Sequence, residues 1–489
     1  MITDQYAFTI LKTIREEIMQ TRLTCNVAVA LVISATATTL GAQDPVATRN
    51  DSAANGKHAS ATVGDSVGVE QRVADLERKL RDLQQAAQKT APPAVKVASI
   101  TAGKEGFSLR APDGDFQLKI RGYFQSDGRF FSDDEQRPGS NTFLLRRVRP
   151  IFEATVYKFV DFRFMPDFGE GRTQLLDAHM DLNLNPALVV RAGKFKPPVG
   201  LERLQSATDL LFVERGLPTN LVPSRDVGVQ VHGNIKGGVL SYALGLFNGT
   251  TDLGSGDADN GNHKDAVVRI FAKPFGTSGP KLLQELGLGA SATRGNHRGT
   301  PSASFLPGYR SNAQQNFFAY RNDASAAGSV IASGEQTRFS PQAYWYAGPF
   351  GLLAEYVRST QEVQRASIAD RLDHSAWQVA GSVVLTRERA SYRGVTPASP
   401  FNPAAHKWGA VELAARVGRL TLDADAFPVF ADSTSQASAA RAYGVGLNWY
   451  LARGIRLMLD YEQTRFSGGA RSGDRETEKV ILTRLQHSF

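Results

Sequence analysis

The chain has 489 residues, of which 42% are hydrophobic and 21% charged, with 45 Gly and a single Cys. That length suffices for one very large domain or for about three ordinary ones of roughly 150 residues each. One cysteine excludes an intrachain disulfide framework and a Cys-rich metal site. The net charge of +8 is spread along the chain, and no zinc-finger or RNA-binding signature is present, so nucleic acid is not indicated as a partner.

The N-terminal segment has the pattern of a secretory signal peptide. Arg22 precedes an apolar run from Leu23 to Ala37, and small residues lead to Ala42. We therefore expect residues 1–43 to be a signal peptide, with Met19 as the true start. The alternative, a membrane anchor, is disfavoured because the run is short and rich in Thr. Beyond this segment the sequence contains no run of about 18 apolar residues, so it predicts no transmembrane helix there.

Residues 44–66 are rich in Ala, Ser, Asp and Gly and read as a disordered linker. A heptad seam follows within residues 67–89, where apolar residues recur at spacings of four and three between charged ones: Val69, Val73, Leu76, Leu80, Leu83 and Ala87. We expect a short coiled-coil helix there, and the alternative is an amphipathic helix packed on its own domain. Pro92 and Pro93 end it, and residues 90–115 read as a second linker.

From Phe116 onward the hydrophobic pattern has a period of two. In "FQLKIRGYFQSD", Leu118 and Ile120 share one face, and Arg121 and Gln125 share the other. About seventeen such segments follow, joined alternately by short turns and long polar connections, and they include a pair at 405–417 and 420–428. This rhythm is typical of an outer-membrane β-barrel, and bacterial barrels have even strand counts, so we predict sixteen strands across residues 116–489.

Two further observations favour the barrel. An array of soluble β-sandwiches would need linkers between groups of strands, and residues 116–489 contain none. The alternating pattern also continues to Phe489, and a terminal aromatic residue is the usual signal for barrel insertion. The fold class predicted is therefore all-β: a 16-stranded transmembrane antiparallel β-barrel with a short N-terminal coiled-coil helix.

One stretch interrupts the pattern. "RAGKFKPPVGLERLQSATDLLFVERG" starts as a strand, but Pro197 and Pro198 cannot continue a central strand because each lacks a backbone N–H. The loop that follows carries several cations. The stretch at about 196–224 therefore reads as a long, basic and partly apolar loop rather than as a strand.

With its ordered motifs "LLRRVR", "LLDAHMDL", "SRDVGVQVHGNI" and "LNWYLARGIRLMLDY", this stretch resembles the phosphate-selective porin O and P family across residues 116–489. The resemblance implies a 16-stranded trimeric porin in the outer membrane of a Gram-negative bacterium, with no cofactor and a third loop folded into the lumen. It implies a passive, anion-preferring channel for phosphate or polyphosphate. A general or differently selective porin remains the alternative.

The resemblance also implies which residues form the constriction. They are the arginine pair Arg146 and Arg147, the loop cation Arg203, the hydroxyl of Ser206 and the acid Asp177. Two positions depart from the family: Arg203 stands where the best-studied members have Lys, and Ala207 replaces the second hydroxyl of a Ser pair.

The spacing of these cations raises a question of geometry. Neighbouring strand residues point to opposite faces, so either a bulge re-aims Arg146 or Arg147, or one of the two lies beyond the membrane band near a subunit interface. Arg147 and Arg149 share a face and are expected to form one ladder of cations. On the first strand Lys119, Arg121 and Arg129 would extend it. Lys194 and Lys196, at the entrance of the loop, would steer anions, whereas Arg215 and Arg225 read as tethers of the loop through carboxylates such as Glu214 and Asp226.

Two other classes of function are weighed against the channel. An outer-membrane enzyme would need a nucleophile and a base at one rim, and the sequence shows no nucleophile elbow. A structural tether would use the coiled coil to contact the cell wall or a periplasmic partner. No metal site is predicted, since the acidic loop at 257–265 lacks the bidentate Glu of a Ca²⁺ loop.

Overall fold

The computed structural model describes residues 66–90, 97–103, 106–132, 135, 139–257 and 261–489. The predicted signal peptide, and the linker at 44–66 except for its last residue, lie outside these ranges. The chain divides into two compact units, residues 1–93 and 94–489, and each is described by itself.

The first unit contributes one helix, α2 (Ser66–Thr90). Four apolar residues of the predicted heptad seam are between 48% and 68% exposed: Val73, Leu76, Leu80 and Leu83. A helix of 25 residues with an open apolar seam gains little from its own side chains, and only one ion pair, Lys79 with Asp75 at 3.2 Å, braces its described surface. Among the described residues, no helix is both long enough and apolar enough to cross a membrane.

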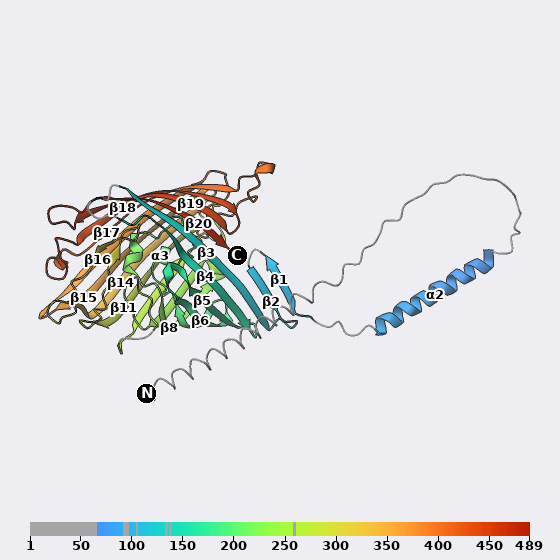
Figure 1. Ribbon diagram of the computed structural model, residues 1–489. Coiled ribbons are helices and arrows are strands. Elements are labelled where there is room, and N and C mark those ends of the chain that lie inside the picture. Colours follow the sequence, from blue (N-terminus) through green and yellow to red (C-terminus); the bar gives the residue numbers. More distant parts are fainter. Residues whose placement is uncertain (1–65, 91–96, 104–105, 133–134, 136–138, 258–260) are drawn as a thin grey trace, which may run out of the picture. The chain divides into compact units, whose positions relative to one another are not determined.

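The second unit is built on one antiparallel sheet of 18 strands (Figure 1). Its strands are β1 (Ser99–Gly103), β2 (Gly106–Arg110), β3 (Phe116–Ser132), β4 (Thr142–Val156), β5 (Val160–Asp167), β6 (Gln174–Asn185), β7 (Leu188–Phe195), β8 (Asp226–Ile235), β9 (Leu240–Phe247), β10 (Asp265–Ala272), β11 (Glu285–Arg298), β14 (Val330–Ala347), β15 (Phe350–Arg365), β16 (Ile368–Val384), β17 (Ala410–Thr421), β18 (Ala437–Ala452), β19 (Ile455–Gly468) and β20 (Glu478–Ser488).

Sixteen of these strands, β3 to β11 and β14 to β20, form a closed ring, because β20 pairs with β3 from Lys479↔Ser132 to Ser488↔Tyr123. The predicted strand count is confirmed. The pair predicted at 405–417 and 420–428 is a single strand, β17, which accounts for the seventeenth segment. Its alternation runs unbroken to Leu420, and the supposed "VGRL" turn lies inside it. Pro428, which cannot donate to a ladder, lies in the connection that follows.

The stretch 90–115, read from the sequence as a linker, contains the hairpin of β1 and β2. β1 pairs with β2 from Ser99↔Arg110 to Gly103↔Gly106. β2 then pairs with the start of β3, from Phe107↔Ile120 to Arg110↔Gln117. The first residues of β3 extend beyond the end of β20, and the hairpin completes the ladder there. Unpaired strand edges are costly, so this edge is covered.

The faces of the ring follow the alternation in the sequence. On β3, Leu118 and Ile120 are exposed on the outside, whereas Tyr123, Gln125 and Asp127 are buried on the inside. The same division of apolar outside and polar inside is expected of a barrel whose outer face meets hydrocarbon. Aromatic rings gather at one rim, where Phe401 packs against Trp408 and Trp449 with centroids 5.7 and 5.4 Å apart.

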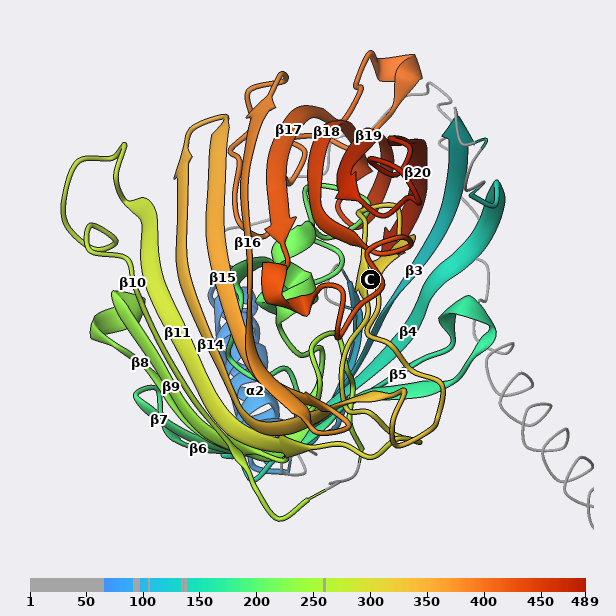
Figure 2. The ribbon, with the colours of Figure 1, turned by 90° about the vertical axis from the view of Figure 1, so that its left-hand side faces the viewer.

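Connections alternate between short and long. The short side carries η3 (Lys236–Gly238) and turns such as 453–454, but it also carries the long connection 385–409 with η4 (Pro403–Ala405). The long side carries η1 (Gly169–Gly171), η5 (Ala424–Ala426) and the small hairpin β12 (Tyr309–Arg310) and β13 (Asn316–Phe318). Loop three, residues 196–225, contains α3 (Leu201–Leu204) and η2 (Leu217–Leu221) and lies inside the ring (Figure 2).

Loop three is held against one side of the barrel wall. Its apolar residues Val199, Leu217, Leu221 and Val222 form one buried cluster with side chains of the hairpin β12–β13 and of the wall. The wall residues in this cluster are Val357, Ala376, Leu420, Leu422, Ala437, Ala440, Ala442 and Phe466. Such burial stabilises the inward position of the loop by roughly 1.5–3 kcal/mol for each large side chain. The lumen that remains open lies between loop three and the opposite wall.

Candidate functional site

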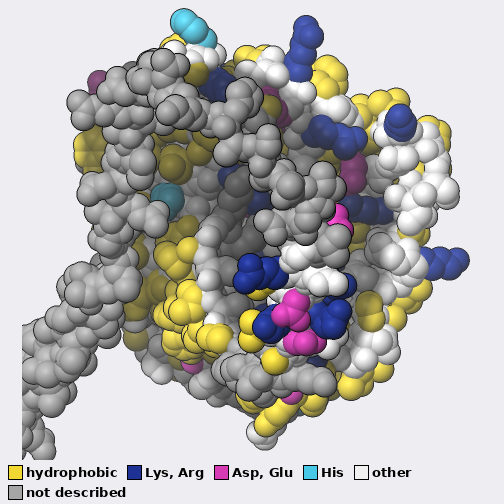
Figure 3. Space-filling view, turned by 90° about the vertical axis from the view of Figure 1, so that its right-hand side faces the viewer, with side chains coloured by type: hydrophobic (Ala, Val, Ile, Leu, Met, Phe, Trp, Pro, Cys, Tyr) yellow, Lys and Arg dark blue, Asp and Glu magenta, His cyan; other side chains and the backbone are white. Residues whose placement is uncertain are grey.

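A polar cavity of about 1370 Å³ runs through the lumen beside loop three. Its lining is dominated by charged side chains from β3, β4, β5, β6 and loop three. Figure 3 shows Lys and Arg side chains around a hollow on one face of the molecule, with carboxylates among them. A cavity of this size and polarity holds water and dissolved ions rather than an apolar ligand.

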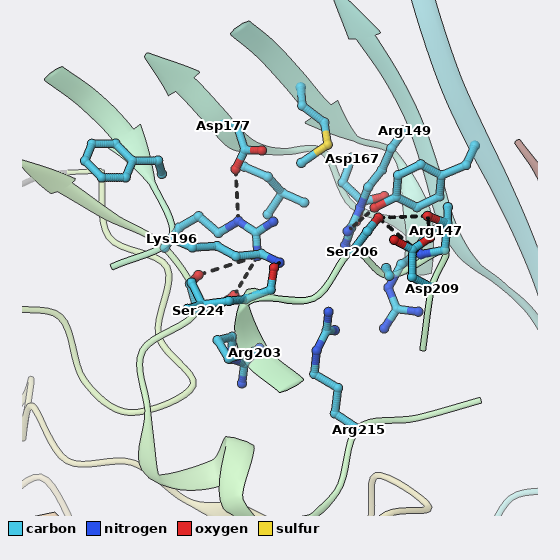
Figure 4. A pocket seen from close by; sticks show the side chains of 18 of the residues that line it. Arg147, Arg149, Asp167, Asp177, Lys196, Arg203, Ser206, Asp209, Arg215 and Ser224 are labelled. Atoms are coloured by element: carbon cyan, nitrogen blue, oxygen red, sulfur yellow. Dashed lines mark hydrogen bonds and ion pairs between the residues drawn. The ribbon is translucent and has the colours of Figure 1, made fainter. Parts of the chain in front are cut away.

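Four cations of loop three line this cavity: Lys196, Arg203, Arg215 and Arg225. We call them the loop-three cluster. Lys196 Nζ and Arg215 Nη2 both donate to the Gln205 carbonyl, each at 2.8 Å. Arg203 Nη2 donates to the Thr219 carbonyl at 2.7 Å. These acceptors are neutral, and within the described residues none of the three cations is paired directly with a carboxylate (Figure 4).

Arg225 is the one member of the cluster with a carboxylate partner. Its Nε donates to Asp177 at 3.1 Å, and Arg163 donates to the other oxygen of the same carboxylate at 3.2 Å. Asp177 therefore lines the lumen cavity, where two arginines hold it. Arg225 does have a carboxylate tether, but it is Asp177, which the sequence did not indicate, whereas Arg215 bonds to the carbonyls of Glu202 and Gln205 instead of a carboxylate.

Mutual repulsion is visible in the protonation equilibria of the loop. Burial, together with the charges of Arg215 and Arg225, lowers the pKa of Arg203 to about 9. Burial and the neighbouring Arg225 likewise lower the pKa of Arg215 to about 10. For Lys196, burial and then Arg225 and Arg215 hold the pKa well below its usual value. An arriving anion would relieve this repulsion.

Hydroxyl groups lie next to the cations. Ser206 lines the cavity, and its Oγ lies 2.8 Å from Oγ1 of Thr208. The sequence comparison pointed to a missing second hydroxyl at Ala207, which is buried in an apolar cluster instead. Thr208 supplies a second hydroxyl one position further along the loop.

The arginine pair of β4 is accommodated by a bulge. The register between β3 and β4 runs from Gln125↔Arg147 directly to Ser126↔Leu145, so Arg146 is the extra residue. A bulge turns the extra side chain to the face of its neighbour. Both arginines therefore face the lumen and both line the cavity.

Both arginines of the pair contact one carboxylate of loop three. Glu214 accepts from Arg146 Nε at 2.5 Å, from Arg147 Nη2 at 3.4 Å and from Arg129 Nη2 at 3.4 Å. Arg484 approaches the same carboxylate at 3.9 Å and pairs mainly with Asp127 at 2.7 Å. We call this group the Glu214 hub. Its arginines keep the pKa of Glu214 well below the usual value, although burial alone would raise it.

A family profile identifies the barrel. The phosphate-selective porin O and P family matches residues 116–489. The chain belongs to this family. It is therefore a porin, a channel of the Gram-negative outer membrane rather than an enzyme. No curated protein sequence matches the chain.

Solved barrels of similar fold include three outer-membrane proteins, each with a TM-score below 0.5. The channel DcaP of Acinetobacter baumannii is 11% identical, with coverage of 76% of this chain and 97% of that one and a TM-score of 0.49. OmpT of Vibrio cholerae is 11% identical, with 77% and 98% coverage and a TM-score of 0.48. An anion-selective porin from Comamonas acidovorans is 9% identical, with 76% and 100% coverage and a TM-score of 0.46. At these scores they carry no further argument.

The predicted ladder of the porin is found in part. Arg149 lines the cavity and pairs with Asp167 at 2.7 Å, and Arg121 lines it and pairs with Glu153 at 2.7 Å. Arg129 is drawn into the Glu214 hub instead of the cavity lining. Lys119 shares the parity of Arg121 but lies exposed near the start of β3, outside the cavity.

The structure places Lys194 outside the cavity. The sequence placed it beside Lys196 at the entrance of the loop, but it does not line the cavity, and its Nζ pairs with Asp257 at 2.5 Å. Lys194 lies on β7 between Gly193 and Phe195, and it has the opposite parity to the lumen-facing Arg191 and Phe195. Lys196 escapes this rule because β7 ends at Phe195.

Several functional residues were not found from the sequence. Glu214 was read only as a partner for Arg215, and Arg163 was not singled out, although it bonds both Asp177 and Glu153. No periodicity marks such residues, since their partners come from other strands. Among the described residues, no group of three or more His, Cys, Asp or Glu could hold a metal ion.

Proposed function

We propose that this porin is a passive channel with a preference for anions, phosphate or a related oxyanion being the solute it selects. The observation that carries the proposal is the loop-three cluster, in which three of four cations bond only to backbone carbonyls. An anion entering a narrow lumen loses part of its hydration, and fixed Arg and Lys side chains replace it.

The residues proposed to bind the anion follow from this arrangement. Arg203 and Arg215 present planar forks that match two phosphate oxygens, and Lys196 adds a compact point charge. Ser206 and Thr208 offer hydroxyl groups at the same wall of the cavity. Arg146, Arg147 and Arg149 are assigned a weaker role because each already contacts a carboxylate.

Planar-bilayer conductance of the purified porin tests the proposal. In potassium chloride we expect a reversal potential that shows chloride preference, and we expect added phosphate to block the chloride current. Arg203→Ala should weaken the block by about tenfold, the equivalent of one charge-assisted hydrogen bond of about 1.4 kcal/mol. Arg298→Ala is the matched control, because Arg298 is exposed and does not line the cavity.

Three outcomes contradict the proposal in different ways. Cation-selective current, or current that phosphate leaves unchanged, would leave a general porin with another selectivity. Absence of current in a correctly folded barrel would move the role toward a structural tether.

We also propose that the porin is a homotrimer and that α2 associates with its copies as a coiled coil. The exposed seam of Val73, Leu76, Leu80 and Leu83 supports the second part. The barrel wall supports the homotrimer. Four of its strands, β5, β7, β9 and β10, have only 8 residues each, whereas a strand needs about 9–11 residues to cross a bilayer. A second copy would cover this low wall.

Deletion of residues 67–89 separates the roles of the two units. Conductance should survive if the barrel alone forms the pore, whereas the trimer should dissociate at a lower temperature if the helices associate. A trimer of unchanged thermal stability would argue against the coiled coil and favour another partner for the helix, such as the cell wall.

A further inference from the structure

The end of the lumen that carries the short turns contains an arginine with incomplete hydrogen bonding. Arg456 lies on β19, next to the turn at 453–454, lines the lumen cavity and is only 2% exposed. Its Nη1 donates to the Tyr450 hydroxyl at 3.2 Å, and its guanidinium lies over the same ring at 5.3 Å. Within the described residues, its Nε and Nη2 have no hydrogen-bond partner.

The two unpartnered atoms form one edge of the guanidinium. Nε–H and Nη2–H point in the same direction, and this edge binds two oxygens of one carboxylate or phosphate side by side. Buried donors without partners are rare because they lose their hydration without compensation. The Tyr450 contact on Nη1 fixes the plane of the group and so aims its other edge.

The surroundings of Arg456 add a second cation. Arg393, on the connection 385–409, is exposed, lines the same cavity and makes no ion pair within the described residues. Asp209 of loop three is a carboxylate close enough for its charge to act on both arginines. Its Oδ1 instead accepts from Thr208 Oγ1 at 2.8 Å, and burial raises the pKa of Asp209.

We propose that Arg456, assisted by Arg393, forms a second oxyanion station at the short-turn end of the lumen, in series with the loop-three cluster. Its ligand is a small oxyanion with two adjacent oxygens, such as inorganic phosphate. The inference rests on the proposed anion passage and adds a site to it. Stations in series allow each to bind weakly enough for release while the lumen as a whole retains its preference.

Access to the station requires a local movement. Nε and Nη2 have no exposed surface, so an arriving anion displaces a neighbouring side chain before it reaches the fork. Arg393 is exposed and can draw the anion to this end of the cavity first. Chloride, with a single centre, gains less from the fork than an oxyanion does.

Phosphate block of chloride current, measured from each side of a planar bilayer, tests the station. The orientation of each channel is read with Ser472→Cys and an impermeant thiol reagent, since Ser472 is exposed in the connection between β19 and β20. We expect Arg456→Met to weaken the block by phosphate added at the short-turn side by about tenfold. Block by phosphate added at the other side should weaken less, because that phosphate meets the loop-three cluster first.

Three controls distinguish the loss of a positive charge, the loss of the two-pronged guanidinium edge and the loss of the fold. Arg456→Lys keeps the charge without the fork, so its block should fall between those of the wild type and Arg456→Met. Lys407→Met removes a charge from the same end, at an exposed residue outside the cavity, and should leave the block unchanged. The shift of the unheated barrel on a denaturing gel shows that each variant is folded.

The outcomes distinguish this inference from the proposed function. If phosphate blocks Arg456→Met as strongly as it blocks the wild type, whichever side it is added to, the second station is wrong while the anion channel stands. If phosphate does not block the wild type from either side, the proposed function fails, and the station fails with it.

Discussion

Arg146 Nε lies 2.5 Å from Oε1 of Glu214, so the arginine that the β4 bulge turns into the lumen meets a carboxylate of loop three there. The bulge thus serves to anchor the loop as much as to present a charge. Arg147 joins the same carboxylate from the next position of the strand. Because Arg129 shares Glu214 as well, this carboxylate balances only part of the positive charge of the pair before any solute arrives.

Removing the carboxylate should free the pair. We expect Glu214→Gln to strengthen phosphate block by up to about tenfold, because Arg147 loses its carboxylate partner and Arg146 keeps only Glu170, 3.1 Å away. The same change leaves buried cations uncompensated, and a loss of about 3–5 kcal/mol of stability is expected. Current block and the thermal midpoint in detergent measure the two effects.

Glu335→Gln is the matched control for this variant. Its carboxylate accepts from Arg294 Nε at 2.6 Å, and neither of these residues lines the cavity. It should change the block much less. Equal block in Glu214→Gln and the wild type would show that the arginine pair takes no part in binding even when free.

The selectivity should depend on pH in the alkaline range. A base with a lowered pKa loses its proton earlier as the pH rises, so Arg203, with a pKa of about 9, loses charge before an ordinary arginine does. Chloride preference should be constant near pH 7 and fall from about pH 9 upward. Reversal potentials in potassium chloride measure this, since chloride itself does not titrate.

Arg203→Met tests the origin of that pH dependence. This variant should have a lower chloride preference at pH 7 and a smaller fall above pH 9, because one of the groups that titrate in this range is gone. A wild-type preference that stays flat beyond pH 10 would contradict the shared repulsion within the loop-three cluster.

The bulge predicts an unusual tolerance to deletion. Deleting Arg146 should restore a regular ladder between β3 and β4 and leave Arg147 opposite Gln125. Deleting Ile151 instead should force the bulge out and turn Arg147 and Arg149 toward the lipid, at about 2–4 kcal/mol for each arginine at the bilayer midplane. The gel shift of the unheated barrel should survive the first deletion and be lost in the second.

The low wall predicts where copies of the porin meet. Leu246 on β9 is exposed on the outside of this wall, and Leu246→Asn should dissociate the proposed trimer in mild detergent. Leu352 on β15 is exposed on a strand of 16 residues, where lipid is expected, and Leu352→Asn is the control. Light scattering gives the mass of each, and dissociation by the control alone would place the interface elsewhere.

Much of the fold could be predicted from the sequence, because strand alternation is a local property. Leu118 and Gln125 lie on the faces that their parity indicates, and sixteen strands close the ring. The error at 420–428 was also local, since a Gly within β17 resembled a turn. The hairpin of β1 and β2 was missed because its residues have weak alternation and depend on β3 for pairing.

The candidate site was less predictable. Asp177, Arg203 and Ser206 line the lumen cavity, and the bulge at Arg146 is one of the two solutions that strand parity left open for the arginine pair. The prediction that Lys194 steers anions did not account for its place on the strand. Neighbouring strand residues point to opposite faces, and Lys194 points away from the lumen. The partner of a cation cannot be derived from spacing when the two come from different strands.

The sequence by itself determined the period-two alternation, and hence a barrel with an apolar outside and a polar lumen, because side-chain direction in a strand depends only on backbone geometry. Only the tertiary structure decided which cations contact a carboxylate and which bond only to carbonyl groups. Ring closure brings Arg129, Arg146, Arg147 and Arg484 to Glu214, while the fold of loop three leaves Lys196, Arg203 and Arg215 facing carbonyl groups. The sequence gives the charge of each residue, but its partner of opposite charge depends on distances that are set only when the chain folds.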